Sequence, residues 1–105
     1  MTEANAAGLV SAARVPTKNG GRYVEQLCRH WEHKLEVQRT ERDASITLPS
    51  GSLVTLSADE DALDITVTAA DAERLAEAQE VVRVHLDRFA FREAPLPFDW
   101  SAASG

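Results

Sequence analysis

The spacing of hydrophobic residues changes twice along the chain. Between residues 24 and 35, hydrophobic side chains recur three and four positions apart, as they do on the buried face of an α-helix. From residue 37 to 69 the spacing becomes two, which is typical of strands with one buried face. After residue 71 the helical spacing returns. The chain is therefore predicted to form a helix, a group of strands and a second helix.

Each helical segment carries one apolar stripe. The stripe of the first segment consists of Val24, Leu27, Cys28, Trp31 and Leu35. The stripe of the second segment consists of Leu75, Ala78, Val82, Leu86 and Phe89. Thr17 or Asn19 can cap the first helix, and Asp71 can serve as the N-cap of the second or lie in its first turn. Both helices are therefore expected to bury one face and expose the other.

Alternating runs and the turns between them predict antiparallel hairpins. The apolar members of these runs are Ile46, Leu48, Val54, Leu56, Leu63, Ile65 and Val67. Ser, Thr and Asp lie between them, and Pro49-Ser50-Gly51 and Ala58–Asp61 supply the turns. Further strands are predicted over residues 37–41 and over residues 9–15, the second of which Pro16 would end. One face of the resulting sheet is aliphatic, and the other is rich in Ser and Thr.

Neither end of the chain shows a regular spacing of hydrophobic residues. Residues 1–8 are small and polar and are predicted to be disordered, and residues 101–105 are predicted to be a frayed terminus. Residues 9–100 then form a single α+β domain. The second helix is predicted to end near Phe91 or Arg92, before Pro95. The tail from Leu96 to Trp100 is expected to cover a sheet edge or a helix end.

The predicted order is strand, helix, four strands, helix, which defines an α+β fold. Two apolar helix faces and one apolar sheet face are buried together when both helices pack on the same face of an antiparallel sheet. That arrangement resembles the TATA-binding-protein-like fold, and a ferredoxin-like fold with the tail as its last strand is the alternative. The predicted core contains Leu27, Cys28, Trp31, Val54, Ile65, Val82, Leu86 and Phe89.

Charge and composition limit the kinds of partner that the chain is expected to bind. The net charge of −6 over 105 residues argues against a nucleic-acid partner, because phosphate binding needs an excess of Lys and Arg. No stretch approaches eighteen apolar residues, and the N-terminus carries an acid where a signal peptide has basic charge. We therefore expect no membrane partner and a cytoplasmic location. Cys28 is the single cysteine, so an internal disulfide is excluded.

The cysteine and the three histidines are the candidate metal ligands of the sequence. Cys28 lies in the apolar stripe, where a small buried side chain is the simplest interpretation. His30 lies about 200° round the helix from Cys28, so the two cannot share an ion. His30 and His33 are three apart and could chelate together, but His33 leans towards solvent, and His85 belongs to the other helix. The sequence therefore predicts no metal, no cofactor and a fold that forms without metal.

The more specific feature is a pair of helix flanks. His85, Arg88 and Arg92 are spaced by three and four on one flank of the second helix. On the first helix Tyr23, His30 and Lys34 occupy a flank next to Leu27. Helices lying side by side would bring the flanks together as a cationic, histidine-bearing seam. The alternative is that Arg88 and Arg92 pair with nearby acids such as Asp87 and Glu93, or suit the helix C-terminus electrostatically.

Two sequence blocks resemble a known family. The run from Arg22 to Lys34, RYVEQLCRHWEHK, and the run from His85 to Glu93, HLDRFAFRE, are similar to the signature blocks of the bacterial domain of unknown function 2218. The resemblance covers roughly residues 11–100. The family has no established activity or assigned catalytic residues. Some members are associated with siderophore-interacting flavin reductases and iron-uptake loci, so the resemblance implies an iron or siderophore context and such a reductase as partner.

Three functions are consistent with these observations. The first is a non-enzymatic module that binds a small anionic ligand or a partner, with a ligand site formed by Tyr23, His30, Lys34, His85, Arg88 and Arg92. The second is a metal- or histidine-dependent enzyme in which His30, His33 or His85 acts as ligand or general base. The third is a structural domain that dimerises through its Ser/Thr-rich sheet face or an edge strand. A concave pocket where the helix flanks meet would favour the first two, and the absence of any pocket there would favour the third.

Overall fold

Five strands and two helices follow one another in the predicted order. The computed structural model describes residues 8–40 and 42–104. The elements are β1 (Leu9–Pro16), α1 (Gly20–Trp31), β2 (Glu36–Arg39), β3 (Asp43–Thr47), β4 (Leu53–Ala58), β5 (Ala62–Ala69) and α2 (Ala72–Phe89). The predicted fold class, α+β with an antiparallel sheet, is confirmed.

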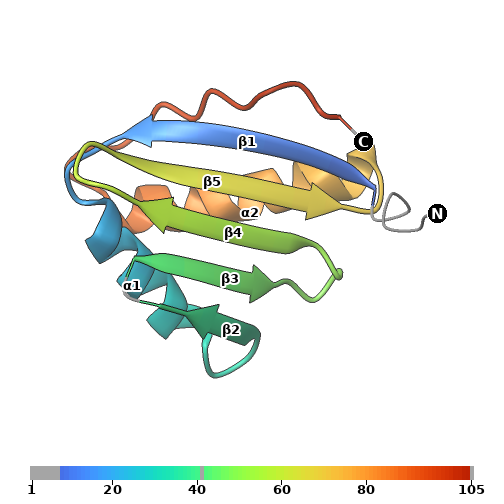
Figure 1. Ribbon diagram of the computed structural model, residues 1–105, viewed down its shortest axis with the longest axis horizontal. Helices are drawn as coiled ribbons and strands as arrows, with labels where there is room; N and C mark the ends of the chain where they lie inside the picture. The colour runs from blue at the N-terminus through green and yellow to red at the C-terminus, as the bar shows by residue number, and fades with distance from the viewer. Residues whose placement is uncertain (1–7, 41, 105) are drawn as a thin grey trace.

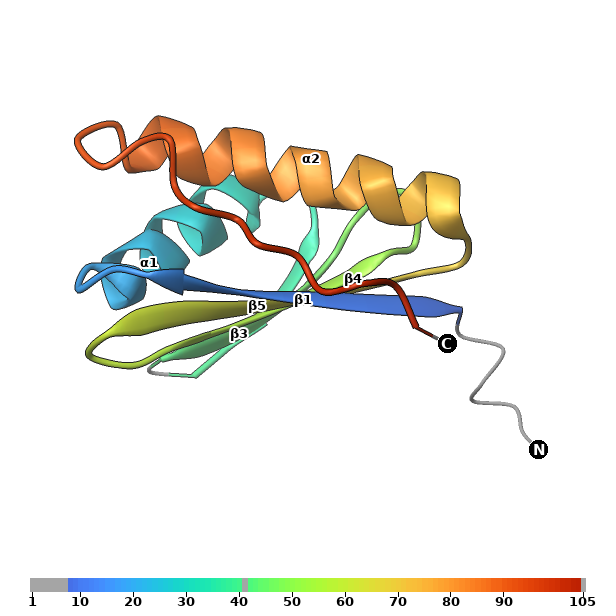
Figure 2. The same cartoon turned by 90° about the horizontal axis from the view of Figure 1, so that it is seen from above.

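The strands form one antiparallel sheet in the order β1-β5-β4-β3-β2 (Figure 1). Strand β1 therefore lies at one edge beside the last strand, and α1 carries the chain across to β2 at the other edge. Both helices cover the same face of the sheet and leave the other face open (Figure 2). This arrangement is the one predicted from the helical and the alternating spacing of hydrophobic residues. The tail does not add a regular strand, so the ferredoxin-like alternative is not the observed fold.

The core lies between the helices and the covered face of the sheet. Strand β4 alternates between buried and more exposed residues along its whole length, and from Leu63 onwards β5 does the same, as a half-covered sheet requires. Seven of the eight predicted core residues are buried: Leu27, Cys28, Trp31, Val54, Ile65, Val82 and Leu86. Phe89 is only partly buried, because it is the last residue of α2. Its ring packs against that of His30 on α1. Neither described helix is long and apolar enough to cross a membrane.

The helix ends were predicted less well than the helix centres. Asp71 is the N-cap of α2, as predicted, and its carboxylate accepts a hydrogen bond of 2.8 Å from the Arg74 N–H. Helix α2 ends at Phe89 rather than near residue 91 or 92, and the N–H groups of Glu93 and Ala94 both donate to the Ala90 carbonyl. A tight turn thus replaces the last predicted helical residues.

The start and the end of α1 also depart from the simple pattern. Asn19 occupies the N-cap position but its side chain does not cap the helix. The N–H groups of Lys34 and Leu35 both donate to the Trp31 carbonyl, which closes α1 at Trp31. Lys34 therefore lies in the turn after α1 rather than on the helix itself.

The C-terminal tail lies along β1. Residues 101–105 were predicted to be frayed, but the Ser101 N–H donates to the Ala12 carbonyl at 2.7 Å, and Val10 and Ser104 exchange backbone hydrogen bonds of 2.7 and 3.0 Å. The described end of the tail therefore covers the β1 edge (Figure 2), as expected for residues 96–100. Apart from Gly8, the segment predicted to be disordered, residues 1–8, lies outside the described residues.

Candidate functional site

The two predicted helix flanks meet where α1 packs against α2. The imidazole centroids of His30 and His85 are 5.1 Å apart. The Trp31 ring lies 4.9 Å from that of His85, and the Phe89 ring lies 5.9 Å from that of His30. Residues 55 positions apart in the sequence thus form one aromatic cluster. We refer to His30, Lys34, His85 and Arg88, with the rings of Trp31 and Phe89, as the helix seam.

His85 is held in one orientation. Its Nδ1 lies 2.7 Å from the Val81 carbonyl oxygen, one turn earlier on α2. Since a carbonyl oxygen only accepts, Nδ1 carries a proton, and Nε2 is the nitrogen with the lone pair whenever the ring is neutral. The Trp31 ring contacts the imidazole, and His85 is half-buried, whereas His30 is exposed. The seam therefore combines one fixed imidazole with one that solvent reaches.

Positive neighbours act on His30. Desolvation by its neighbours lowers the pKa of His30 first, and the electrostatic influence of His85, Arg88 and Lys34 lowers it further. The His30 imidazole is therefore neutral at pH 7 and keeps a lone pair. The same influence places Lys34 and Arg88 within electrostatic reach of the histidine pair.

The acids nearest to Arg88 and Arg92 have other partners. Asp87 forms an ion pair with Arg83 at 3.2 Å and accepts a hydrogen bond from the Leu96 N–H. Glu93 accepts hydrogen bonds from Tyr23, Asn19 and Thr17. Among the described residues, the ion pairs hold Arg14, Lys18, Arg29, Arg74 and Arg83, but not Lys34, Arg88 or Arg92. The ion pairs of Arg88 and Arg92 with Asp87 and Glu93, one part of the predicted alternative, are therefore not observed. The other part holds for Arg88, which lies in the last turn of α2, where a positive charge suits the helix C-terminus.

Tyr23 does not belong to the seam. Its side chain is buried, and its hydroxyl donates to the Glu93 carboxylate. Burial raises the pKa of Tyr23 first, and the neighbouring carboxylate raises it further. The hydroxyl is committed to this internal contact, so the structure separates Tyr23 from the four residues that do meet.

Arg92 is also apart from the histidine pair. Its guanidinium carbon lies 5.7 Å from the Phe91 ring centroid. Arg92 lines a groove of about 410 Å³ together with Tyr23 and Gln26 of α1 and Phe89 of α2. Four of the six predicted site residues therefore come together, and the other two, Tyr23 and Arg92, line the adjoining groove.

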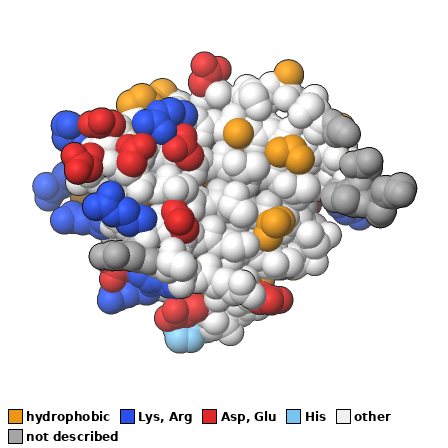
Figure 3. Space-filling view, in the orientation of Figure 1, with side chains coloured by type: hydrophobic (Ala, Val, Ile, Leu, Met, Phe, Trp, Pro, Cys, Tyr) orange, Lys and Arg blue, Asp and Glu red, His pale blue; other side chains and the backbone are white. Residues whose placement is uncertain are grey.

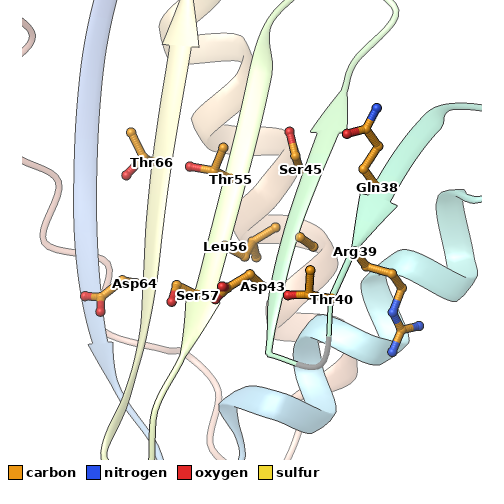
Figure 4. A pocket seen from close by; sticks show the side chains of 11 residues that line it. Gln38, Arg39, Thr40, Asp43, Ser45, Thr55, Leu56, Ser57, Asp64 and Thr66 are labelled. Carbon is orange, nitrogen blue, oxygen red and sulfur yellow. The ribbon is translucent and has the colours of Figure 1, made fainter.

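The open face of the sheet forms a second, different hollow. It has a volume of about 560 Å³. Figure 4 shows Thr66, Thr55, Ser45 and Gln38 in a row across four neighbouring strands. Charged side chains gather towards one end of this face, and its centre is mostly uncharged (Figure 3). The alternation predicted the Ser/Thr-rich face but not the hollow, which arises from the curvature of the sheet.

The described residues offer few groups for a metal ion. No group of three or more His, Cys, Asp or Glu side chains gathers within residues 8–40 and 42–104. Cys28 has no exposed surface, and burial is the main cause of its raised thiol pKa. His33 is exposed. The two imidazoles of the seam are the pair that the fold brings together.

Comparison with known proteins places the chain in a family. A solved structure, the NMR structure of PA4090 from Pseudomonas aeruginosa, is similar with a TM-score of 0.79 and 34% identity, covering 92% of this chain and 99% of that one. No curated protein is significantly similar to the chain. Residues 12–101 match the family model described as an uncharacterized protein conserved in bacteria. The chain therefore belongs to this bacterial family, the domain of unknown function 2218.

Proposed function

We propose that the chain is a non-enzymatic binding module whose helix seam captures a small anionic ligand. One observation carries the proposal: Arg88 follows His85 by three residues on α2, Lys34 lies in the turn after α1, and neither takes part in the ion pairs of the described residues. Cationic side chains that lie outside the ion pairs of the described residues, in a chain of net charge −6, form a local site of opposite sign.

The residue types suit a carboxylate or phosphate. The Arg88 guanidinium offers a planar fork of donors for two oxygen atoms of one anion, and Lys34 adds a mobile point charge. The rings of Trp31 and Phe89 contact the two imidazoles, so one side of the seam is apolar. The seam therefore offers both charge and an apolar wall.

Binding is favoured over catalysis by what touches the imidazoles. A histidine base acts on a nucleophile or substrate proton within hydrogen-bond reach. Within the described residues, the hydrogen bonds to the two rings comprise one contact, from His85 to the Val81 carbonyl. A binding role needs no further protein group, whereas an enzyme would need one that these contacts do not include.

The family resemblance suggests a particular ligand and partner. Because some relatives are associated with iron uptake, we propose a carboxylate-bearing ferric siderophore as the natural ligand and a siderophore-interacting reductase as the partner. Citrate is the simplest probe of the same chemistry, since it presents three carboxylates on a small flexible frame.

Citrate titration by calorimetry tests the proposal on the full chain. Lys34→Gln with Arg88→Gln is expected to weaken citrate binding at least about tenfold, because two charge-assisted contacts are lost. Arg92→Gln is expected to have a smaller effect, since Arg92 lies in the adjoining groove. The control is Lys18→Gln with Arg74→Gln, which removes the same charge from residues paired with Asp61 and Asp71.

Two outcomes would contradict the proposal. One is the absence of citrate binding to the unmodified chain at millimolar concentration. The other is equal weakening by the seam variant and by the control, which would show that net charge rather than the seam determines affinity. Circular dichroism of each variant establishes that the fold is retained.

A further inference from the structure

The two imidazoles of the seam have the separation of a chelating pair. We propose that His30 and His85 together bind one divalent transition-metal ion, and that the anion captured by Lys34 and Arg88 is bound to that ion. The binding of a metal ion by the two histidines, the metal half of this inference, goes beyond the proposed function. The capture of a metal-bound anion by Lys34 and Arg88, the anion half, rests on the proposed function and names its ligand class as a metal–carboxylate complex.

The ring geometry supports the metal half. A metal–imidazole bond of about 2.0–2.1 Å and a roughly tetrahedral angle place two imidazole centroids about 5 Å apart. The observed separation of the His30 and His85 centroids is 5.1 Å. His30 is exposed, so its ring can turn towards a shared ion without displacing a buried group. The packing of α1 against α2 therefore brings the two rings close enough for one ion to reach both.

His85 also has the support that metal-binding histidines usually have. A ligating histidine commonly donates its other ring N–H to a carboxylate or a backbone carbonyl, which fixes the tautomer and the ring orientation. Nδ1 of His85 lies 2.7 Å from the Val81 carbonyl, and the Trp31 ring contacts the imidazole at 4.9 Å. These contacts leave Nε2 as the atom that would bind the ion.

The charges around the two histidines indicate which other ligands the metal ion would have. Two nitrogen ligands leave at least two coordination positions of a tetrahedral ion for other groups. Lys34 and Arg88 repel a bare dication, but they attract one whose remaining positions are occupied by carboxylates. A metal–carboxylate complex thus uses the imidazoles and the cations together, whereas a bare ion or a free anion uses only one of the two sets.

The choice of metal follows from the ligand atoms. Neutral imidazole suits copper, zinc and nickel, and the divalent series gives copper the highest affinity. Zinc is therefore a suitable probe for calorimetry, and copper for electron paramagnetic resonance, where coupling to nitrogen nuclei reports imidazole ligation. Cys28 has no exposed surface and does not compete for either ion in the folded chain.

The first experiment titrates zinc into the full chain. Binding is expected at one site, weakened at least about tenfold in His30→Gln and in His85→Gln, and changed less than about twofold in His33→Gln. His33 is the matched control, because it is an exposed histidine close to His30 that makes no ring contact with His85. Equal zinc affinity in His30→Gln and the unmodified chain would overturn the metal half, whatever the citrate titration shows.

The second experiment separates a metal–anion complex from competition for the metal. Citrate is added to the chain loaded with less than one equivalent of copper. Nitrogen coupling is expected to persist in the unmodified chain and to be lost in Lys34→Gln with Arg88→Gln, where citrate removes the copper. Loss of the coupling in both chains would overturn the anion half while leaving a metal site. Persistence in both would show that Lys34 and Arg88 do not hold the anion, and would also overturn it.

Discussion

Glu93 connects two parts of the chain that are distant in the sequence. Its carboxylate accepts hydrogen bonds from Thr17 at 2.9 Å, from Asn19 at 3.0 Å and from the Tyr23 hydroxyl. These donors belong to the loop before α1 and to its first turns, whereas Glu93 follows α2. Hydrogen bonds from Tyr23, and then from Asn19, lower the pKa of the Glu93 carboxyl below its ordinary value of 4.5.

We predict that Glu93→Gln lowers the free energy of unfolding by about 1 kcal/mol at pH 7, because a charged acceptor is replaced by a neutral one. A lowered folded-state pKa means that the carboxylate stabilises the fold fully above its ordinary pKa. This contribution is lost as the pH falls through the lowered value. Urea unfolding of both chains from pH 7 down to about pH 3 should therefore show the difference shrinking in acid.

Glu60→Gln is the control for this measurement, since Glu60 is exposed in the turn between β4 and β5. It should change the free energy of unfolding by less than about 0.5 kcal/mol. A constant difference between Glu93→Gln and the unmodified chain at every pH would contradict the prediction, because a steric effect of the substitution would not titrate.

Sequence reasoning at this scale succeeded where a residue's role depends on its neighbours along the chain. Cys28 and Leu86 lie in stripes with a fixed period, and both are buried. Tyr23 was misplaced because its position at the border of the α1 stripe is compatible with either side. Its inward orientation depends on Glu93, 70 residues later, and no local pattern encodes that hydrogen bond.

At the scale of the elements, two adjacent glycines at the start of α1 meet different surroundings. A Cβ atom at Gly20 would lie 3.2 Å from the Ala58 Cβ and 3.3 Å from the Ala62 carbonyl oxygen, where α1 begins against the β4–β5 turn. A Cβ atom at Gly21 would meet nothing within 4 Å. Gly20 is thus needed for a close approach, and Gly21 is not.

We predict opposite effects for the two substitutions. Gly21→Ala should raise the free energy of unfolding by about 0.5–1 kcal/mol, because alanine loses less backbone entropy in a helix. Gly20→Ala gains the same entropic term, but it must displace backbone and a buried methyl group, so it should destabilise the chain by about 1 kcal/mol or more. Chemical denaturation of the two variants checks this, and equal stabilisation by both would refute the predicted contact at Gly20.

The order of the elements was predictable, and their ends were not. The spacing of hydrophobic residues changes from 3.6 to 2 and back over many residues. The pattern therefore does not depend on any single side chain. The end of a helix depends on a few backbone hydrogen bonds, such as those of Glu93 and Ala94 to the Ala90 carbonyl. The flank containing His85 and Arg88 was predicted for the same reason as the helix. That His30 lies beside His85 required the packing of α1 against α2, which periodicity does not specify.

At the scale of the whole molecule, the C-terminal tail covers the outer edge of β1, which is an edge strand of the sheet. Backbone hydrogen bonds join the tail to Val10 and Ala12, and the Ser11 hydroxyl donates to the Ser101 carbonyl at 2.6 Å. The rings of Phe98 and Trp100 stack 5.9 Å apart and pack against the core. The segment thus covers an edge that would otherwise present unpaired backbone groups to other chains.

We predict that removing residues 98–105 lowers the free energy of unfolding by about 2–4 kcal/mol, through lost hydrogen bonds and lost apolar packing. The shortened chain should also self-associate, because the uncovered β1 edge can pair with another strand. Sedimentation velocity and urea unfolding measure the two effects. Phe98→Ala with Trp100→Ala keeps the backbone cover, so this variant should be destabilised yet remain in the association state of the unmodified chain. Self-association of this variant to the same extent would show that exposed apolar surface, and not the open β1 edge, drives association.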